Sequence, residues 1–460
     1  MPEFEPLYTA DEMRSAERGH DVRDLMERAG WAAAQVGLQV FPRAERWTIV
    51  CGGGANGGDG RIAARHLEEA GKAVTIVDAK AGSPDLGEPQ AIVDALFGTG
   101  FTGKPRAEAA ALIERINAAP APVLAIDVPS GVDASTGEVP GVAVKARETV
   151  TFHGRKLGAV VAPGRFHAGT VHVVDIGLEP AETGARLATP ALLQSVRRRR
   201  EGDNKYTAGH VLVVGGSRGL TGAPSLTALA ALRADAGYVT VAAPESTLHV
   251  FEERLLEAVK RPLPDEAGLV AEGSASIVRE LAAKASAVAL GPGLGRGPGP
   301  KELVRELLET LELPVVVDAD ALFELEPARW GGPRVLTPHE GELARLLGRE
   351  ARDVAAHRLS SVREAAERFD CVVVLKGPDT LVAAPGRELL VSGLGLPSLA
   401  TAGTGDVLTG IIAAFLAKGM EPQLAAVAGA AAQQRASVEA RQRAGLIASD
   451  LVDALPRALR

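Results

Sequence analysis

The chain has 460 residues, enough for about three domains of ordinary size or for two large ones. Hydrophobic residues make up 46% of the chain and charged residues 23%, a balance typical of globular proteins and too apolar for a disordered one. Asp and Glu number 58 against 50 Lys and Arg, and the resulting net charge of −8 argues against a nucleic-acid-binding protein.

Cysteine use and hydropathy indicate the compartment. Cys51 and Cys371 lie far apart in the chain, so they suit neither a disulfide framework nor a metal-ligand cluster and are typical of a reducing compartment. No apolar run reaches the roughly 18 residues that a membrane span needs, and the opening residues lack the apolar segment of a signal peptide. We therefore expect a soluble, cytoplasmic protein with no membrane partner.

The first half of the chain alternates short apolar strands with amphipathic helices. A helix with apolar or small residues at Leu25, Met26, Ala29 and Ala33 opens it. Continuous apolar strands that alternate with helices are typical of a parallel sheet covered on both faces. The predicted elements that follow are a strand at 47–51, a glycine-rich loop, a helix at 61–70, and strands at 74–77, 91–96 and 123–128.

A basic joint separates this half from a second α/β pattern. Residues 197–200 are four arginines, which fit a solvated linker better than a phosphate-binding patch. We therefore divide the chain into a first domain at 1–196, a linker at 197–204 and a second domain at 205–460. The strands predicted in the second domain lie at 210–214, 238–242, 287–290, 315–317, 334–336, 371–375 and 380–383, and their spacing by helices indicates one large three-layer domain.

The densest motif is VCGGGANGGDG at residues 50–60, between a predicted strand and a predicted helix. Its glycines allow positive φ and a close approach of the backbone to a ligand, and amide groups at a helix start attract anions. The motif is neither the usual dinucleotide fingerprint nor a Walker loop, since no Gly-Lys-Ser/Thr follows. A plain turn needs no carboxylate, so Asn56 and Asp59 within the motif indicate a ligand site.

Two more strand ends combine a carboxylate with a glycine-rich loop. Asp94 lies on a predicted strand that leads into the loop at 98–103, and Asp127 ends another strand before a turn that contains Ser130. Ligands of parallel sheets bind at the carboxyl ends of the strands. We therefore expect these two loops and the glycine motif to converge on one site.

The strongest motif of the second domain is TAGTGD at residues 401–406, at the start of a helix that ends near Gly419. Amide groups at such a helix start stabilise a transferring phosphoryl group, and Asp406 can accept a proton from a substrate hydroxyl.

Glu340 and Glu342 start another helix, where carboxylates could position a hydrated cation. Lysine is rare, at 11 of the 50 basic residues, and the lysines beside glycine-rich or turn-rich segments are Lys104, Lys205 and Lys376.

With these motifs, the first half resembles the NAD(P)H-hydrate epimerase family over most of residues 1–190. The resemblance implies a Rossmann-like fold and the interconversion of the two epimers of hydrated NADH and NADPH. Ala55 replaces the first Asn of the family motif Asn-Asn-Gly-Gly-Asp-Gly, whereas Asp59 is kept. The resemblance also implies a potassium ion held by Asn56, Asp94 and Ser130. The substrate-binding residues that it implies are Ala55, Asn56, Gly57, Gly58, Asp59, Gly98, Thr99, Gly100, Phe101, Thr102, Gly103, Lys104 and Asp127.

Across residues 205–460 the strings GGSRGLTGAP, VVDADAL, TPHEGE, VVLKGPDT and AGTGDVLTG are similar, in this order, to the ADP-dependent NAD(P)H-hydrate dehydratase family. The resemblance implies a ribokinase-like three-layer fold. Asp235 stands where the family commonly has Gly, which we expect to affect helix termination more than chemistry. The substrate-binding residues that the resemblance implies are Ala223, Gly293, His339 and Asp406. The nucleotide-binding residues that it implies are Lys376, Gly377, Pro378, Asp379, Thr380 and Gly405.

Together the two resemblances favour a bifunctional enzyme that epimerises the R and S forms of hydrated NAD(P)H and dehydrates the S form with ADP. We expect ADP, potassium and magnesium as cofactors, no nucleic-acid partner, and a homo-oligomer. Asp406, Asp127 and Asp59 are the expected catalytic residues. For epimerisation we favour Asp127, since Asp59 lies among glycines and could mainly fix its loop.

Two other functions stay open on the sequence alone. One is a ribokinase-like small-molecule kinase with an accessory nucleotide-binding domain, because such kinases share the AGTGD motif. The other is a non-catalytic dinucleotide sensor, which would not need the carboxylates of the sites. The order of the motifs and the attached epimerase-like half favour the repair enzyme.

Overall fold

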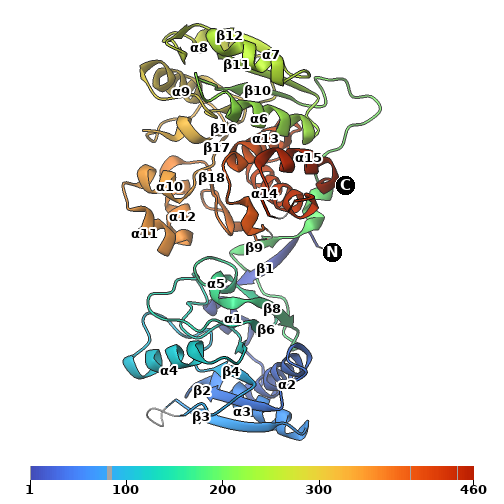
Figure 1. Cartoon of the computed structure of the whole chain (residues 1–460), viewed down its shortest axis with the longest axis vertical. Helices are drawn as coiled ribbons and strands as arrows, with labels where there is room; N and C mark the ends of the chain where they lie inside the picture. The colour runs from blue at the N-terminus through green and yellow to red at the C-terminus, as the bar shows by residue number, and fades with distance from the viewer. Residues whose placement is uncertain (1, 80–84, 394, 443) are drawn as a thin grey trace. The chain divides into compact units, whose positions relative to one another are not determined.

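In the computed structural model, which describes residues 2–79, 85–393, 395–442 and 444–460, the chain divides into two compact units. The N-terminal unit comprises residues 6–185 and 355–358, and the C-terminal unit comprises residues 1–5, 186–354 and 359–460 (Figure 1). Residues 186–196 belong to the C-terminal unit because Leu192, Leu193 and Val196 are buried in its hydrophobic core. The domain limits expected from the sequence remain a prediction.

The N-terminal unit is built on a six-stranded sheet. Its strands are β2 (Arg46–Cys51), β3 (Ala73–Asp78), β4 (Ala91–Ala95), β5 (Val123–Ile126), β6 (Glu148–Phe152) and β8 (Thr170–Val174), all parallel, in the order β3-β2-β4-β5-β6-β8. The main helices are α2 (Val22–Val40), α3 (Ala55–Glu69) and α4 (Ala107–Ala118). Ile49 and Val93 pack with α2 and α3, whereas Val50 and Ile92 pack with α4. Both faces are therefore covered, and the predicted three-layer, Rossmann-like fold is confirmed.

Smaller elements complete this unit. They include α1 (Ala10–Ala16), α5 (Arg165–Ala168), the short strand β7 (Arg155–Lys156) and the last three residues of β1 (Phe4–Tyr8). Leu7 and Tyr8 pair in parallel with Arg155 and Lys156. β7 follows β6 after a tight turn, so Lys156 lies close to the end of β6. The pairing with β1 holds β7 in an extended conformation.

The helix after the first glycine motif begins earlier than the sequence predicted. α3 starts at Ala55 rather than at residue 61, and Gly54 is its N-cap. The motif lies wholly within the described residues, and none of its glycines uses the positive φ that glycine allows. Glycine is needed for close packing instead, since a Cβ at Gly57 would lie only 2.0 Å from the carbonyl oxygen of Gly52. The motif thus presses the first turn of a helix against the strand end.

The C-terminal unit contains a larger sheet. Its strands are β10 (His210–Val214), β11 (Tyr238–Pro244), β12 (Val259–Leu263), β15 (Ala287–Leu290), β16 (Val315–Val317), β17 (Arg334–Leu336), β18 (Val372–Leu375), β19 (Thr380–Ala383) and β20 (Leu389–Ser392). They lie in the order β12-β11-β10-β15-β16-β17-β18-β19-β20, parallel from β12 to β18 and antiparallel from β18 to β20. Every strand predicted for this domain is present, and β12 and β20 are additions.

Helices cover both faces of this sheet. One face packs against α6 (Gly222–Arg233), α13 (Thr404–Ala417), α14 (Pro422–Glu439) and α15 (Ala448–Ala458), which group together in Figure 1. The other helices are α7 (Leu248–Arg254), α8 (Ala275–Ala282), α9 (Pro298–Thr310), α10 (Glu340–Leu347), α11 (Ala351–Ala356) and α12 (Arg358–Phe369). Val213 and Val241 join the core with α13, and the alternate residues Leu212 and Val288 are also fully buried. The predicted three-layer fold is confirmed. Across the described ranges, no helix is long and apolar enough to cross a membrane.

The close packing of α3 gives a testable prediction. We expect Gly57→Ala to lower the free energy of unfolding by about 1–3 kcal/mol, because the new methyl group overlaps the Gly52 carbonyl. Gly54→Ala is the matched control, since nothing lies within 4 Å of a Cβ there. It should change stability by less than about 1 kcal/mol. Chemical denaturation of the two variants measures the difference, and equal stabilities would contradict the packing argument.

Candidate active sites

A pocket of about 650 Å³ lies at the carboxyl ends of the strands in the N-terminal unit. It is lined on one side by α1 and α2 and on the other by the loops that follow β2, β4 and β5. The predicted residues that line it are Ala55, Asn56, Asp59, Gly98, Thr99, Gly100, Phe101, Thr102 and Asp127. The predicted residues Gly57, Gly58, Gly103 and Lys104 are not among its lining. The structure therefore brings the three predicted loops together at one site.

A lysine that the sequence did not single out forms the base of this pocket. Lys156 is 1% exposed, and its Nζ lies 2.7 Å from Oδ1 of Asp127. The same ammonium group donates to the Thr151 hydroxyl at 3.0 Å and to the Phe152 carbonyl at 2.8 Å. Asp127 has a φ of 69°, a backbone conformation that only a few per cent of residues other than glycine adopt.

Asp59 shares the pocket with this ion pair. Its side chain is 9% exposed, and Oδ1 has no hydrogen-bond partner among the described residues. Burial raises the pKa of Asp59 to about 8, and the nearby carboxylates of Asp127 and Glu17 add to the increase. Burial also raises the pKa of Glu17, followed by the charge of Asp127. At neutral pH the pocket therefore holds a protonated Asp59 beside an ion-paired Asp127.

The residues expected to bind potassium are linked by hydrogen bonds, and one of them, Asn56, also lines the pocket. Asp94 is fully buried and accepts from the backbone N–H of Ser130 at 2.8 Å and from its hydroxyl at 2.6 Å. Asn56 donates to the Phe97 carbonyl at 2.8 Å, and the Phe97 N–H donates to the Ser130 hydroxyl oxygen at 2.8 Å. Burial raises the pKa of Asp94 to about 6, although the hydrogen bonds from Ser130 and Leu96 oppose the rise. One continuous network thus links Asn56, Asp94 and Ser130.

In the C-terminal unit, Asp406 lies in the first turn of α13, whose N-cap Gly403 has a φ of 88°. A second buried ion pair lies beside it: Lys376 Nζ is 2.8 Å from Oδ1 of Asp318 and 3.8 Å from Oε2 of Glu342. A Cβ at Gly405 would lie 3.2 Å from that Nζ, so the lysine reaches the start of the helix. The structure therefore joins the predicted residues Lys376, Gly405 and Asp406.

Asp318 is a site residue that sequence reasoning missed. It follows the buried strand β16 within the string VVDADAL, and its Oδ2 accepts from Thr409 on α13 at 2.7 Å. Burial would raise the pKa of Asp318, but Lys376 and the hydrogen bonds from Lys376 and Thr409 lower it. Burial would lower the pKa of Lys376, but Asp318 and Glu342 raise it. A carboxylate directly after a buried parallel strand was the available signal.

The environment of Asp406 suits proton transfer near neutral pH. Burial raises the pKa of Asp406 to about 7, together with the negative charge of Asp318 and against the positive charge of Lys376. Asp320 and Glu342 add smaller increases. A general base is most effective when its pKa lies near the working pH. The geometry and the charge around Asp406 therefore fit the predicted role of this residue.

The other predicted substrate residues of this unit lie on separate elements. Ala223 is in α6, where its carbonyl accepts from Thr227, whose hydroxyl also lies 3.1 Å from the Asp406 carbonyl. Gly293 has a φ of 59°, and its carbonyl accepts from the Ser217 N–H at 2.7 Å. His339 is the N-cap of α10, with Nδ1 accepting from the N–H groups of the next turn.

The His339 side chain is 57% exposed, and its Nε2 lies 3.5 Å from Oε1 of Glu342. The predicted nucleotide residues Lys376, Gly377, Pro378 and Asp379 form the connection from β18 to β19, and Thr380 is the first residue of β19. His339 follows β17 and Lys376 follows β18, so both lie at the carboxyl ends of parallel strands, as Asp318 does after β16. The structure therefore leaves these predictions in place without testing them.

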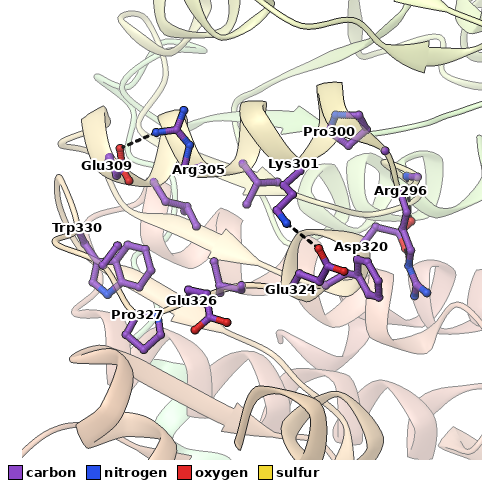
Figure 2. A pocket seen from close by; sticks show the side chains of 17 residues that line it. Arg296, Pro300, Lys301, Arg305, Glu309, Asp320, Glu324, Glu326, Pro327 and Trp330 are labelled. Atoms are coloured by element: carbon purple, nitrogen blue, oxygen red, sulfur yellow. Dashed lines mark hydrogen bonds and ion pairs between the residues drawn. The ribbon is translucent and has the colours of Figure 1, made fainter. Parts of the chain in front are cut away.

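A further pocket of about 570 Å³ lies beside α9 and is drawn in Figure 2. Its walls include Val304, Leu308 and Trp330, and none of the predicted site residues is among the described residues that line it. Three cations face four carboxylates there, with Lys301 paired to Glu324 at 2.7 Å. Because the negative charges are in excess, this pocket suits a dinucleotide poorly.

The pKa of Asp59 predicts a pH-dependent stability. Between about pH 4 and pH 8 folded Asp59 keeps a proton that the unfolded chain releases, so its effect on stability becomes more unfavourable as pH rises through this window. Asp127, Glu17 and Lys156 are the charged groups that face it. Asp59→Asn removes this dependence, which has a slope of at most about 1.4 kcal/mol per pH unit.

Calorimetry of the full chain measures this effect. The Tm of Asp59→Asn relative to the parent should be higher at pH 8 than at pH 5. Asp11→Asn is the control, because the Asp11 side chain is 86% exposed. A Tm difference that is the same at the two pH values would contradict the assignment.

Comparisons with known proteins identify family models that match both halves of the chain. A family model described as NAD(P)H-hydrate dehydratase matches residues 211–457, and one described as YjeF-related protein N-terminus matches residues 22–85 and 78–158. A solved structure of an ADP/ATP-dependent NAD(P)H-hydrate dehydratase from Bacillus subtilis, co-crystallised with ATP and Mg²⁺, has a TM-score of 0.52 and 27% identity. It covers 59% of this chain and 96% of its own.

Relatives that match almost the whole chain carry both halves. The bifunctional NAD(P)H-hydrate repair enzyme Nnr of Moorella thermoacetica is 39% identical, covering 95% of this chain and 92% of the relative. The Escherichia coli enzyme of the same name is 34% identical, covering 98% of this chain and 93% of the relative. The chain therefore belongs to the family of bifunctional NAD(P)H-hydrate repair enzymes.

Proposed function

We propose that this chain repairs hydrated NADH and NADPH in two steps at two sites. The N-terminal unit interconverts the R and S epimers, and the C-terminal unit dehydrates the S epimer to NAD(P)H with ADP. The observation that carries the proposal is the placement of Asp406, with a pKa of about 7, at the start of α13 beside Lys376. The kinase alternative is not favoured, since relatives matching nearly the full chain are repair enzymes.

In the dehydratase half, Asp406 accepts the proton of the substrate hydroxyl as that oxygen attacks the terminal phosphoryl group of ADP. The N-terminal amides of α13 and the ammonium group of Lys376 stabilise the negative charge that develops on the phosphoryl oxygens. AMP leaves, and the phosphorylated hydroxyl then departs as phosphate when a ring proton is lost, which restores the reduced ring. Ala223, Gly293 and His339 bind the substrate, and Lys376, Gly377, Pro378, Asp379, Thr380 and Gly405 bind the nucleotide.

Magnesium accompanies the nucleotide in this proposal. The described residues contain no group of three His, Cys, Asp or Glu side chains arranged to hold a metal ion directly. Mg²⁺ commonly keeps several water ligands and binds through substrate phosphates. Glu340 and Glu342 at the start of α10 fit an outer role, in which they hold water molecules on the ion.

In the epimerase half, the pocket residues Ala55, Asn56, Asp59, Asp127 and the loop at 98–104 bind the hydrated ring and its ribose phosphate. Asp127 and Asp59 carry the proton transfers that inversion at the hydroxyl-bearing carbon requires. Phe97 and Phe101 stack with ring centroids 4.6 Å apart at the pocket wall, which offers a flat apolar surface to the ring.

Asn56, Asp94 and Ser130 hold a potassium ion in this proposal. The donor set fits a hard cation, because it offers amide, carboxylate and hydroxyl oxygens and the nearby Phe97 carbonyl. The buried Asp94 carboxyl would gain a positive charge beside it. When bound, the ion supplies a fixed positive charge that holds the loop after β4 against the loop after β5.

The cellular setting is also part of the proposal. Cys51 and Cys371 are both free and buried, which supports a reducing compartment such as the cytoplasm.

A homo-oligomer is also part of the proposal, because it would cover large apolar side chains that are exposed in the single chain. Examples are Trp31, Phe166 and Leu256, which are 51%, 66% and 82% exposed. Size measurement in solution tests the oligomeric state.

The direct test of function supplies purified protein with each epimer of hydrated NADH in turn, with and without ADP. We expect absorbance of the reduced nicotinamide to recover only with ADP, and from both epimers. Recovery from the S epimer alone would remove the epimerase half of the proposal. No recovery from either epimer would remove the dehydratase half.

We expect Asp406→Asn to lower ADP-dependent turnover about 10²- to 10⁴-fold, because the variant keeps the shape of the side chain and loses the base. In the parent, kcat/KM should rise with pH through about 7, because only the deprotonated carboxylate accepts the proton. Asp453→Asn, outside the site on α15, is a suitable control. Near-parental turnover in Asp406→Asn would contradict the assignment.

We expect potassium to raise the Tm of the parent chain and the rate of epimer exchange, with choline chloride as the control for ionic strength. Asp94→Asn should weaken both responses, because it removes the charged oxygen ligand. Thermal unfolding across a potassium titration measures the first response. An identical potassium response in parent and variant would contradict the ion site.

A further inference from the structure

Lys156 is fixed more tightly than charge neutralisation requires. Its three ammonium hydrogens meet three acceptors, namely Oδ1 of Asp127, the Thr151 hydroxyl and the Phe152 carbonyl. An ammonium group has only three donors, so no further hydrogen bond to a ligand is left to it. Its position therefore serves the groups around it rather than the substrate.

Thr151 closes a triangle with this pair. Its hydroxyl accepts from Lys156 and donates to Oδ1 of Asp127 at 3.0 Å. Oδ1 of Asp127 thus receives two donors, whereas Oδ2 receives none from the described residues. Asp127 lines the pocket, so Oδ2 remains available to a ligand while the two donors to Oδ1 hold the carboxylate in place.

The backbone around the triangle is also unusual. Asp127 has a φ of 69° and His153, in the turn that leads from β6 to Lys156, has a φ of 65°. Residues other than glycine are strained in this region and persist only where the surrounding structure holds them. One such residue is the aspartate of the ion pair, and the other lies in the turn before its lysine. The position of the Asp127 carboxylate is therefore itself under constraint.

A second carboxyl in the pocket complements the first. Asp59 is on α3 and is 9% exposed, and its Oδ1 has no partner among the described residues. Burial raises the pKa of Asp59 to about 8, and the charges of Asp127 and Glu17 add to the rise, so the carboxyls are near enough to influence each other. Among the described residues, Asp127 is therefore bound to a cation, whereas Asp59 is not.

We propose that Lys156 and Thr151 are positioning residues that hold Asp127 as the proton acceptor of epimerisation, with Asp59 as the proton donor in the same pocket. The inference rests on the proposed epimerase function and deepens it. Asp59 and Asp127 are then both catalytic residues, with separate roles, and neither serves only to fix a loop.

These roles permit a reaction that returns both carboxyls to their starting state. The hydroxyl-bearing carbon of the hydrated ring is bonded to the ring nitrogen. Asp127 takes the hydroxyl proton, the carbon–nitrogen bond breaks with its electron pair on nitrogen, and Asp59 protonates the nitrogen, which leaves an open-chain aldehyde. Rotation about the adjacent carbon–carbon bond presents the other face of the carbonyl. The nitrogen then attacks, Asp59 recovers its proton from nitrogen, and Asp127 returns its proton to oxygen.

Epimer exchange in the full chain without ADP isolates this step, because the dehydratase half is then inactive. We expect Thr151→Val to lower kcat about tenfold with KM within twofold, since the carboxylate loses one fixed donor. Thr151→Ser keeps the hydroxyl and should retain near-parental kcat. Thr149→Val is the matched control, because Thr149 is buried on the same strand and donates to Ala168 outside the pocket.

Lys156→Ala should lower kcat about 100-fold, and added ethylammonium should restore part of the rate by replacing the missing ammonium group. Circular dichroism confirms folding, and ADP-dependent turnover of the S epimer reports on the other half. Parental kcat in Thr151→Val, or loss in Lys156→Ala that ethylammonium does not restore, would overturn the positioning role. A parent chain that exchanges no epimers would instead overturn the proposed epimerase function.

Discussion

A buried lysine–aspartate ion pair organises each of the two sites. Lys156 lies 2.7 Å from Asp127 in the N-terminal unit, and Lys376 lies 2.8 Å from Asp318 in the C-terminal unit. Isolated charges are costly to bury, so each partner depends on the other for its place in the protein. Beside each pair lies a carboxyl without such a close cation, and burial together with neighbouring carboxylates raises its pKa to about 8 or about 7. Each unit thus combines a fixed charge with a carboxyl that titrates near neutral pH.

The parallel sheets determine where these groups meet. Strand ends in a parallel sheet share one edge, and the helices that follow begin at the same edge with unpaired amide groups. Asp127 and Asp318 each follow a strand directly, whereas Asp406 belongs to the first turn of a helix. The electrostatic arrangement is therefore a consequence of strand direction, and two sheets of different size produce similar local chemistry. This similarity does not require the two units to act on the same step of the reaction.

Much of this arrangement could be predicted from the sequence, and the reasons for the omissions are physical. Apolar strands and glycine-rich ends identified the three-layer folds and placed Asp59, Asp127 and Asp406 at sites. Lys156 was missed because it belongs to a segment of short strands without a motif, and its partner lies 29 residues away in the chain. Asp318 was missed as a site residue because only the folded sheet brings it to Lys376. The glycines of the first motif allow both positive φ and a close approach of the backbone, and composition alone does not distinguish the two uses. In the structure their small size serves helix packing.

Each site depends on a carboxyl that titrates near neutrality, Asp59 in one unit and Asp406 in the other. A ¹³C NMR titration of the full chain labelled at its aspartate carboxyl carbons, compared with Asp59→Asn and Asp406→Asn, measures them individually. We predict one resonance that titrates near pH 8 and is absent in Asp59→Asn, and one that titrates near pH 7 and is absent in Asp406→Asn. Loss of only resonances that titrate below about pH 5, in the range of ordinary aspartates, would contradict the account.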